Sequence, residues 1–429
     1  MNVLIIGSGG REHTLAWKIN QSPSCEKLYV LPGNAGTEKI AENLDINSSD
    51  YQRIKDFVLK QQIDLVVVGP EAPLVDGIRD YFREDDQLKE VHFIGPGRHG
   101  AMLEGSKDFA KEFMKKYQIP TAGFRSFTVE MISEARSHIK KMKTPIVVKA
   151  DGLAAGKGVI ICDNHKDAEK ALENMLLNNQ FGTAGSKVVI EEYLEGIEVS
   201  VFLLTDGKDY VIFPEAKDYK RIGENDTGPN TGGMGSVSPV VFADPSFMRK
   251  VEDRIIKPTI GGLSKEGIEF TGFIFLGLMN SGGDPYVIEY NVRMGDPESQ
   301  VVIPRIENDL VDLLIAAARG QLKGKEVKIS DHTAVTIVLA SGGYPGNYEK
   351  GKVIQGLDKV DRGIVFHAGT GTNHKHQILT RGGRVLAVTG LGESLKEALD
   401  IAYAEIKKVQ WEGMQFRKDI GQDLLKLEK

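Results

Sequence analysis

The sequence predicts a multidomain α/β protein that begins with a parallel sheet and ends with a mainly antiparallel one. Over the first hundred residues, short apolar runs bounded by glycine alternate with amphipathic stretches, which is typical of a parallel sheet with helices on both faces. From about residue 326 the pattern changes to apolar strands separated by short turns. The chain of 429 residues, 41% of them hydrophobic, is long enough for roughly two to four domains.

The composition argues against several classes of partner. A net charge of −6 without a long basic run argues against nucleic acid, and no apolar run approaches the ~18 residues of a membrane span. The N-terminus enters a strand directly, so we expect no signal peptide and a cytoplasmic protein. Cys25 and Cys162 form no CxxC pair, which argues against a disulfide framework or structural zinc. His367, His374 and His376 are expected to be surface polar residues rather than metal ligands.

The N-terminal elements follow from the positions of these runs. Apolar runs predict strands at 2–7, 27–32, 64–68 and 91–94, and amphipathic stretches predict helices at 12–20 and 51–63. Ligands of such sheets bind at the carboxyl ends of strands. The glycine-containing stretches GSGGREH, LPGNAGT, GPEAPL and GPGRHGA all fall there.

The GSGGREH turn at 7–13 does not fit a dinucleotide site. Glu12 stands where the G-x-G-x-x-G fingerprint requires glycine, and the strand at 27–32 ends without the acidic residue that would bind a ribose. A glycine turn that leads into a helix can still hold a single phosphate, helped by Arg11. The turn therefore favours a phosphorylated sugar over NAD, and a turn without a ligand is the alternative.

The stretch KADGLAAGKGV at 149–159 is not a Walker A loop. Only three residues separate Gly152 from Gly156, and Lys157 is followed by Gly158 instead of a hydroxyl residue. The β-branched run before it predicts a buried strand that ends at Lys149, which would hold a fixed charge toward a phosphate beneath a glycine flap. A plain glycine hairpin with solvated lysines is the alternative.

Two further stretches suggest a nucleotide site. A helix within 104–122 is predicted to open with a Ser cap, and Lys107 in its first turn is a second phosphate ligand unless it is a solvated surface lysine. The stretch 188–204 predicts two strands around an acidic turn. Its four glutamates would repel one another unless they met donors such as an adenine amino group and ribose hydroxyls, or formed a solvated edge hairpin. They are Glu191, Glu192, Glu195 and Glu198.

The stretch 270–300 predicts two strands, the second of which carries a metal site. Glu289 and Asn291 are two residues apart and share one face, where their oxygens suit Mg²⁺ beside a triphosphate. Arg293 falls on the same face and can bind a carboxylate or phosphate. Before it, residues 214–239 predict a long polar glycine-rich loop, of a kind rare in compact domains unless functional.

Eight stretches in this order resemble the phosphoribosylamine–glycine ligase (glycinamide ribonucleotide synthetase) family of the ATP-grasp superfamily. They are VLIIGSGGREH, GPEAPL, GSKDFAKEFM, VVKADGLAAGKGV, EEYLEG, DTGPNTGGMG, EYNVRMGDPESQ and LASGGYPG. The resemblance covers essentially the whole chain. It implies ATP-dependent ligation of glycine to 5-phosphoribosylamine through a glycyl phosphate, with Mg²⁺ or Mn²⁺, in a monofunctional cytoplasmic monomer that meets other purine-pathway enzymes only transiently.

The resemblance also implies a division of the chain and roles for its residues. Residues 1–103 would form a Rossmann-like phosphosugar-binding domain, 104–325 a two-lobed ATP-grasp domain with a mobile flap at about 123–193, and 326–429 a mainly antiparallel C-terminal domain. ATP would be bound by Lys107, Lys149, Gly156, Lys157, Glu191, Leu194 and Glu198, and the metal by Glu289 and Asn291. Phosphoribosylamine would lie against Gly9, Gly10, Arg11, Glu12, Pro70 and Glu71. Glycine would lie near Asn230, Thr231, Gly232, Gly233 and Met234, with Arg293, Asp218 and Lys149 catalytic.

Two departures and several alternatives accompany this interpretation. The stretch FIFLGLM lacks the acid that many ATP-grasp enzymes place on the strand before the metal-binding strand. Tyr219 stands where a histidine is usual, which excludes a histidine acid–base role there. The GGR and SGGYP turns after residue 326 need not be catalytic. The alternatives are another ATP-grasp carboxylate–amine ligase or carboxylase, a nicotinamide dehydrogenase, and a non-catalytic nucleotide-binding regulator.

Overall fold

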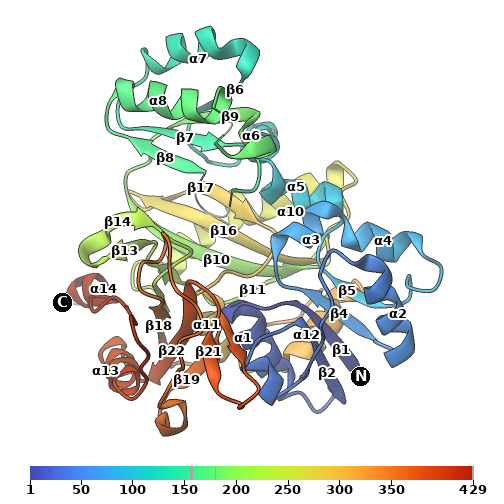
Figure 1. Cartoon of the computed structure of the whole chain (residues 1–429). Coiled ribbons are helices and arrows are strands. Elements are labelled where there is room, and N and C mark those ends of the chain that lie inside the picture. Colours follow the sequence, from blue (N-terminus) through green and yellow to red (C-terminus); the bar gives the residue numbers. More distant parts are fainter. Residues whose placement is uncertain (155–157, 179, 428–429) are drawn as a thin grey trace.

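The computed structural model describes residues 1–154, 158–178 and 180–427. It is a multidomain α/β structure in which an N-terminal unit, a central region and a C-terminal sheet pack together, while one lobe projects from the central region (Figure 1). Gly156 and Lys157, which were predicted to bind nucleotide, lie outside the described residues.

The N-terminal unit is the predicted parallel sheet. All of its pairings are parallel, in the order β3-β2-β1-β4-β5. Its strands are β1 (Asn2–Gly7), β2 (Lys27–Pro32), β3 (Glu42–Asn43), β4 (Leu65–Val68) and β5 (His92–Ile94). Its helices are α1 (Gly10–Ile19), α2 (Tyr51–Gln61), α3 (Glu71–Asp76), α4 (Ile78–Glu84) and α5 (Arg98–Gly105). The sequence pattern did not predict β3, α3 and α4, because elements of two to seven residues are too short to show a hydrophobic period.

The central region contains two antiparallel sheets. The sheet with the longer strands forms the body of the region. The body sheet has the order β11-β10-β16-β17 and all its pairings are antiparallel. Its strands are β10 (Ile197–Thr205), β11 (Tyr210–Ile212), β16 (Gly272–Ser281) and β17 (Asp284–Asn291). Helix α6 (Lys107–Lys116) begins as predicted after Ser106, whose hydroxyl accepts a hydrogen bond from Phe109 N at 3.1 Å.

The second antiparallel sheet forms the projecting lobe, which we call the flap lobe (residues 124–192). Its order is β6-β9-β7-β8, and two helices cover one face (Figure 1). The elements are β6 (Phe124–Thr128), α7 (Ile132–Ile139), β7 (Ile146–Ala150), β8 (Val159–Cys162), α8 (His165–Leu176) and β9 (Lys187–Glu192). The core of the lobe contains Phe127, Val148, Leu172 and Ile190 and is separate from the cores of the rest of the molecule. The lobe therefore packs as a unit of its own.

The stretch 188–204 forms two strands on either side of an acidic segment, as predicted, whereas the alternative of an edge hairpin is wrong. Strand β9 belongs to the flap lobe and β10 to the body, so residues 193–196 cross between the two. The prediction that 214–239 is a long loop is also wrong. This stretch forms β12 (Lys217–Asp218), β13 (Arg221–Gly223), β14 (Thr227–Asn230) and β15 (Gly235–Ser238). Strands β13 and β14 pair with each other and β12 pairs with β15, but β15 also pairs with the distant residues 334–337, which local composition does not reveal.

The C-terminal sheet is antiparallel, as predicted, but it is built from two parts of the chain. Its order is β12-β15-β18-β22-β19, so two of its strands come from residues 217–238. The others are β18 (Thr333–Ala340), β19 (Ile364–His367) and β22 (Arg384–Gly392), and α13 (Leu395–Ile406) packs against β18 and β22. Among the described residues, none of the helices combines the length and apolarity needed to span a bilayer.

His367 is buried, which corrects its prediction as a surface residue. It is 3% exposed, whereas His374 and His376 are exposed as expected. The backbone N–H of His367 donates to Nδ1 of His13 at 2.8 Å, and the His13 ring packs edge-on against Phe366. This contact joins α1 of the N-terminal unit to β19 of the C-terminal sheet.

Because His13 is buried, we expect the protein to lose stability in mild acid. Burial, together with Lys39, lowers the pKa of His13 to about 4, below its value of about 6.5 in the unfolded chain. The unfolded state therefore binds more protons as the pH falls below about 6.5, which favours unfolding. Between pH 7 and 5, this one histidine should cost about 2 kcal/mol of unfolding free energy.

The variant His13→Asn keeps an acceptor for the His367 N–H and removes this titration. Urea unfolding at pH 7 and pH 5 should show a smaller loss of stability in the variant than in the wild type. His376→Asn, at an exposed position, is the matched control and should retain the wild-type loss. Equal acid sensitivity in the wild type and His13→Asn would contradict the prediction.

Candidate functional site

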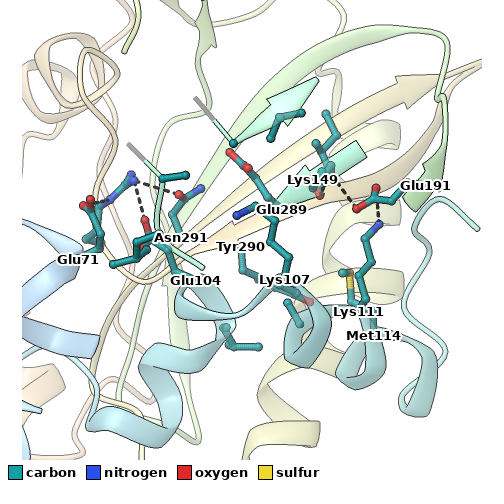
Figure 2. Close-up of a pocket in the computed structure, with 18 residues that line it drawn as sticks. Glu71, Glu104, Lys107, Lys111, Met114, Lys149, Glu191, Glu289, Tyr290 and Asn291 are labelled. Atoms are coloured by element: carbon teal, nitrogen blue, oxygen red, sulfur yellow. Dashed lines mark hydrogen bonds and ion pairs between the residues drawn. The ribbon is translucent and has the colours of Figure 1, made fainter. Parts of the chain in front are cut away.

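A cavity of about 160 Å³ lies where the flap lobe meets the body and α6 (Figure 2). Charged side chains from all three surround it, along with Leu153, Ala154 and Gly158 of the glycine-rich stretch. Its charged and amide residues are Glu71, Glu104, Lys107, Lys111, Lys149, Glu191, Glu289, Asn291 and Arg293. The structure thus brings together residues from five separate segments of the sequence. We call this the first cavity.

Two predicted phosphate ligands, Lys107 and Lys149, enter the first cavity from different elements. Lys107 is the first residue of α6, and its Nζ donates to Gly152 O at 3.1 Å. Burial lowers the pKa of Lys107, with a smaller lowering by Lys149, while Glu289 opposes the shift. Lys149 lies near the end of β7, as predicted, and its Nζ donates to Ile288 O at 3.3 Å.

Glu191 is the acidic residue that lies between the lysines. In the β7–β9 register, Val147 is opposite Glu191 and Lys149 is opposite Val189, so the two charged side chains share one face of the sheet. Lys149 Nζ lies 3.0 Å from Glu191 Oε1, and Lys111 Nζ lies 2.8 Å from Oε2. Sequence reasoning missed Lys111, although its spacing of four residues from Lys107 placed both on one face of a helix.

The predicted metal ligands Glu289 and Asn291 both line the first cavity from β17. Although burial alone would raise it, the pKa of Glu289 is lowered by Lys220, Lys149 and Lys107. Glu289 is therefore ionised and available to a cation. Asn291 is 6% exposed, and its Oδ1 accepts a hydrogen bond from Arg293 Nη2 at 3.0 Å.

Arg293 is held at the rim of the first cavity by residues of three elements. Its Nη2 donates to Glu104 Oε1 of α5 at 2.7 Å, and its Nε donates to Glu71 Oε2 of α3 at 3.4 Å (Figure 2). Glu104 was not predicted. Burial raises the pKa of Glu104 to about 7, against the lowering effect of Arg293. Because Glu71 and Glu104 belong to the N-terminal part, Arg293 connects that part to the body.

Asp218 and Lys220 form a neighbouring charged group with Glu198. Lys220 pairs with Glu198, and despite burial the carboxylates of Glu198 and Asp218 raise the pKa of Lys220 well above its usual value. Burial and Glu198 raise the pKa of Asp218, with Lys220 opposing. Tyr219, which replaces the usual histidine, turns away and donates to Asp423 Oδ1.

A second, larger cavity of about 630 Å³ lies at the carboxyl ends of the parallel strands. Its lining combines the N-terminal glycine turn with residues from the central and C-terminal parts. It consists of Gly7, Ser8, Gly9, Arg11, Glu12, Pro32, Asp45, Ile46, Asn47, Ser48, Pro70, Asp296 and Arg384. Four of the predicted sugar-binding residues, Gly9, Arg11, Glu12 and Pro70, are in this lining, whereas Glu71 lines the first cavity.

Glu12 occupies the position that a dinucleotide-binding turn leaves to glycine. Its side chain packs so closely that a Cβ at Gly7 or Gly69 would lie 2.4 Å or 2.0 Å from it. Its carboxylate accepts a hydrogen bond from Gly9 N and pairs with Arg11 Nε at 2.6 Å. The start of α1 therefore already has an anion, which makes it less suited to phosphate than the sequence suggested.

Arg384 completes the second cavity from the C-terminal sheet. It begins β22, and its Nη1 donates to Asp296 O at 2.6 Å and to Gly232 O. Nη1 also lies 3.5 Å from Asp296 Oδ1. The sequence contained the GGR turn, but only the packing of the C-terminal sheet shows that its arginine reaches this cavity.

Several predicted residues lie outside the lining of both cavities. Met234 is fully buried, and its N–H donates to Tyr219 O at 2.7 Å, so neither its side chain nor its amide faces a cavity. In the described part of the chain, there is no group of three or more His, Cys, Asp or Glu side chains that could hold a metal ion. The others outside the lining are Gly10, Leu194, Glu198, Asp218, Asn230, Thr231, Gly232 and Gly233.

Comparison with known families accounts for nearly the whole chain. Residues 1–104 match the N domain of phosphoribosylglycinamide synthetase, residues 105–299 match its ATP-grasp (A) domain, and residues 334–423 match its C domain. These matches cover both cavities and the flap lobe.

Curated relatives extend the similarity over full length. The chain is 46% identical to phosphoribosylamine–glycine ligase of Yersinia pestis, 48% identical to that of Vibrio vulnificus strain YJ016 and 45% identical to that of Escherichia coli K12. Each match spans 426 residues, which is 98% of this chain and 98% of the relative.

Solved structures agree. The crystal structure of phosphoribosylamine–glycine ligase from Thermotoga maritima has a TM-score of 0.84 and 38% identity, over 98% of this chain and all of that one. The biotin carboxylase domain of Hydrogenobacter thermophilus 2-oxoglutarate carboxylase shares the fold alone, at a TM-score of 0.70 and 17% identity, over 96% of this chain and 91% of that one. The chain belongs to the phosphoribosylglycinamide synthetase family of ATP-grasp ligases.

Proposed function

We propose that this protein joins glycine to 5-phosphoribosylamine, using ATP, and forms glycinamide ribonucleotide, ADP and phosphate. The observation that carries the proposal is the segment Arg293–Asp296. Arg293 borders the first cavity, rich in lysine, and Asp296 borders the second, which faces the parallel strands. A nucleotide in one cavity and a phosphosugar in the other would therefore meet at this segment.

ATP suits the first cavity. Lys107 and Lys149 would bind its phosphates, because both bring positive charge to the lining of the cavity from ordered elements. Glu191, Leu194 and Glu198, near the crossover from the flap lobe to the body, would contact adenine and ribose. The glycine-rich stretch around Gly156 and Lys157 would close over the phosphates, as the family resemblance implies.

A divalent cation, Mg²⁺ or Mn²⁺, fits Glu289 and Asn291. Glu289 supplies an ionised carboxylate, and Asn291 Oδ1 keeps a second lone pair beside its bond from Arg293. Bound there, the cation would neutralise charge on the transferring phosphoryl group. The protein's own contribution is to hold these two oxygens on one strand.

Phosphoribosylamine suits the second cavity, with its ribose hydroxyls near Glu12 and its phosphate near Arg384. Carboxylates accept hydrogen bonds from hydroxyls, whereas the phosphate needs a cation that is not already paired as closely as Arg11 is. Gly9 and Pro70 would complete this side, whereas Glu71 lines the first cavity beside Arg293. Glycine would lie between the cavities near Arg293 and Asp218, with the backbone of residues 230–233 beyond.

The reaction then needs two steps. A carboxylate oxygen of glycine attacks the γ-phosphorus of ATP, which breaks the bond to the β-phosphate oxygen and gives glycyl phosphate and ADP. The amine of phosphoribosylamine attacks the glycyl carbonyl, phosphate leaves, and the nitrogen loses a proton. Positioning and charge neutralisation by the lysines and Arg293 would be the main contribution of the protein. Closure of the flap lobe would exclude water from the acyl phosphate.

This proposal assigns separate tasks to three parts of the chain. Residues 1–103 bind the sugar, residues 104–325 bind ATP and glycine, and residues 326–429 close the sugar site through Arg384. A different ATP-grasp ligase would share the first cavity but would not need the second. The proposed reaction and that of another ATP-grasp ligase therefore differ in the amine that accepts the acyl group.

The proposed reaction is tested by the substrate dependence of ADP release. With Mg²⁺ and ATP, rapid ADP formation should require both glycine and phosphoribosylamine generated in situ, and mass spectrometry should identify glycinamide ribonucleotide. Rapid ADP formation with a different acid or amine, and none with this pair, would contradict the proposed substrates.

Glu289→Ala should abolish turnover because it removes the only carboxylate of the proposed cation site. We expect the ligation rate to fall by at least ~100-fold with the circular dichroism spectrum unchanged. Glu130→Ala, at an exposed position of the flap lobe that lines neither cavity, should retain wild-type activity. Normal activity in Glu289→Ala would remove the metal assignment.

Arg384→Ala should weaken the binding of phosphoribosylamine while leaving ATP binding intact. Loss of one charge-assisted contact to phosphate should raise the KM for this substrate by roughly 10- to 100-fold. Arg381→Ala changes an exposed arginine of the same turn and should leave this KM unchanged. An unchanged KM in Arg384→Ala would place the phosphate elsewhere.

A further inference from the structure

Lys111 is a buried charge for which the proposed reaction provides no task. It lies one turn after Lys107 on α6, and its side chain is 2% exposed. Its Nζ lies 2.8 Å from Glu191 Oε2 and donates to Thr121 Oγ1 at 2.8 Å. Figure 2 shows Lys111 and Lys149 approaching the same carboxylate, Glu191, from opposite sides. The three side chains share one negative and two positive charges out of contact with water.

The two lysines are not held equally. Lys111 has two contacts at 2.8 Å, and its second partner, Thr121, is fixed in turn because its hydroxyl donates to Val287 O at 2.6 Å. Lys149 is held by its 3.0 Å ion pair with Glu191 and by a long hydrogen bond to Ile288 O at 3.3 Å. Glu191 Oε1, which faces Lys149, is fully buried and has no hydrogen bond of acceptable geometry among the described residues. Lys149 is thus the lysine that can turn away.

A nucleotide phosphate in the first cavity would draw Lys149 from Glu191. Without another cation, Glu191 would then remain as an uncompensated buried carboxylate, which is strongly unfavourable. We propose that Lys111 is a positioning residue that remains paired with Glu191, so that Lys149 can transfer its charge to the nucleotide. This inference rests on the proposed function, because it takes ATP to occupy this cavity.

The position of Lys111 also allows this pairing to persist when the flap lobe moves. Helix α6 packs against α5 and β17, on the body side, whereas Glu191 belongs to β9 of the flap lobe. The pair lies close to the crossover at 193–196 that joins the two. Rotation of the flap lobe about this crossover would change the length of the pair little, because the pair lies beside it.

The charge state of Lys111 provides a signature for this role. Burial, together with Lys149 and against Glu191, lowers the pKa of Lys111 to about 8. Glu191 on β9 and Lys149 on β7 face it, and Lys107 of its own helix and Glu289 of β17 line the same cavity. An anionic nucleotide stabilises the protonated form, so binding is coupled to proton uptake. Above about pH 8, ATP affinity should therefore fall by at most about tenfold per pH unit.

The test is direct binding of ATP, with Mg²⁺ but without the other substrates, by calorimetry from pH 7 to 9.5. Lys111→Met removes the charge at nearly constant volume and should raise the Kd at pH 7 by about tenfold or more, since Lys149 is then the only partner of Glu191. Adding Glu191→Gln to this variant should recover much of the loss relative to Glu191→Gln alone. Lys115→Met, an exposed lysine one turn further on, is the control and should bind like the wild type.

The pH dependence of ATP affinity in Lys111→Arg distinguishes the proposed role from a purely structural one, which would leave this dependence unchanged. Arginine remains charged at these pH values, so the alkaline loss of affinity should be smaller than in the wild type, and any remainder would belong to Lys107. If Lys111→Met fails to fold, the comparison of Lys111→Arg with the wild type still tests the inference. Equal pH slopes in the wild type and Lys111→Arg, or unchanged affinity in Lys111→Met, would overturn the inference while leaving ATP as the substrate. A wild-type protein that binds no ATP would instead contradict the proposed function.

Discussion

The guanidinium group of Arg293 is the interaction on which the arrangement of the site depends. It lies just beyond β17 and bonds to Glu71, Glu104 and Asn291, so it joins the N-terminal helices to the strand that carries Glu289 and Asn291. A planar group with several fixed donors is suited to bringing together acceptors from three elements. Arg293 lines the first cavity and lies three residues before Asp296, which lines the second, so the contacts that join these elements also hold the two cavities beside each other.

Around this centre, charges compensate one another in small groups. Lys111, Glu191 and Lys149 form a buried group, and Glu198, Lys220 and Asp218 form a partly exposed one. Buried charges are costly unless paired, so each group constrains its members to a narrow set of positions. Such groups contribute less to stability than apolar packing would, but they leave positive charge where a polyphosphate would bind. The pairing is therefore better understood as preparation for a ligand than as a means of stabilising the fold.

The second cavity illustrates how three parts of the chain can share one site. Glu12 lies tightly between Gly7 and Gly69 at the end of the parallel strands, and Asp296 and Arg384 close the opposite side. The glycines are needed there because a side chain would collide with the carboxylate of Glu12. The same carboxylate separates this turn from dinucleotide-binding turns, in which the helix terminus is left open for a phosphate.

The sequence by itself determined the elements with a strong period and the chemistry of the residues at their ends. The parallel sheet, α1, α2, α6, the strand that ends near Lys149 and the common face of Glu289 and Asn291 all follow from local patterns. Tertiary structure alone decided that β9 and β10 belong to different sheets, that β12 and β15 join the C-terminal sheet, and that His367 is buried. It also decided that Lys111, Glu104 and Arg384 reach the cavities. The physical reason is that strand pairing and the burial of charge depend on contacts between segments far apart in the chain, and these leave no periodic trace in either segment.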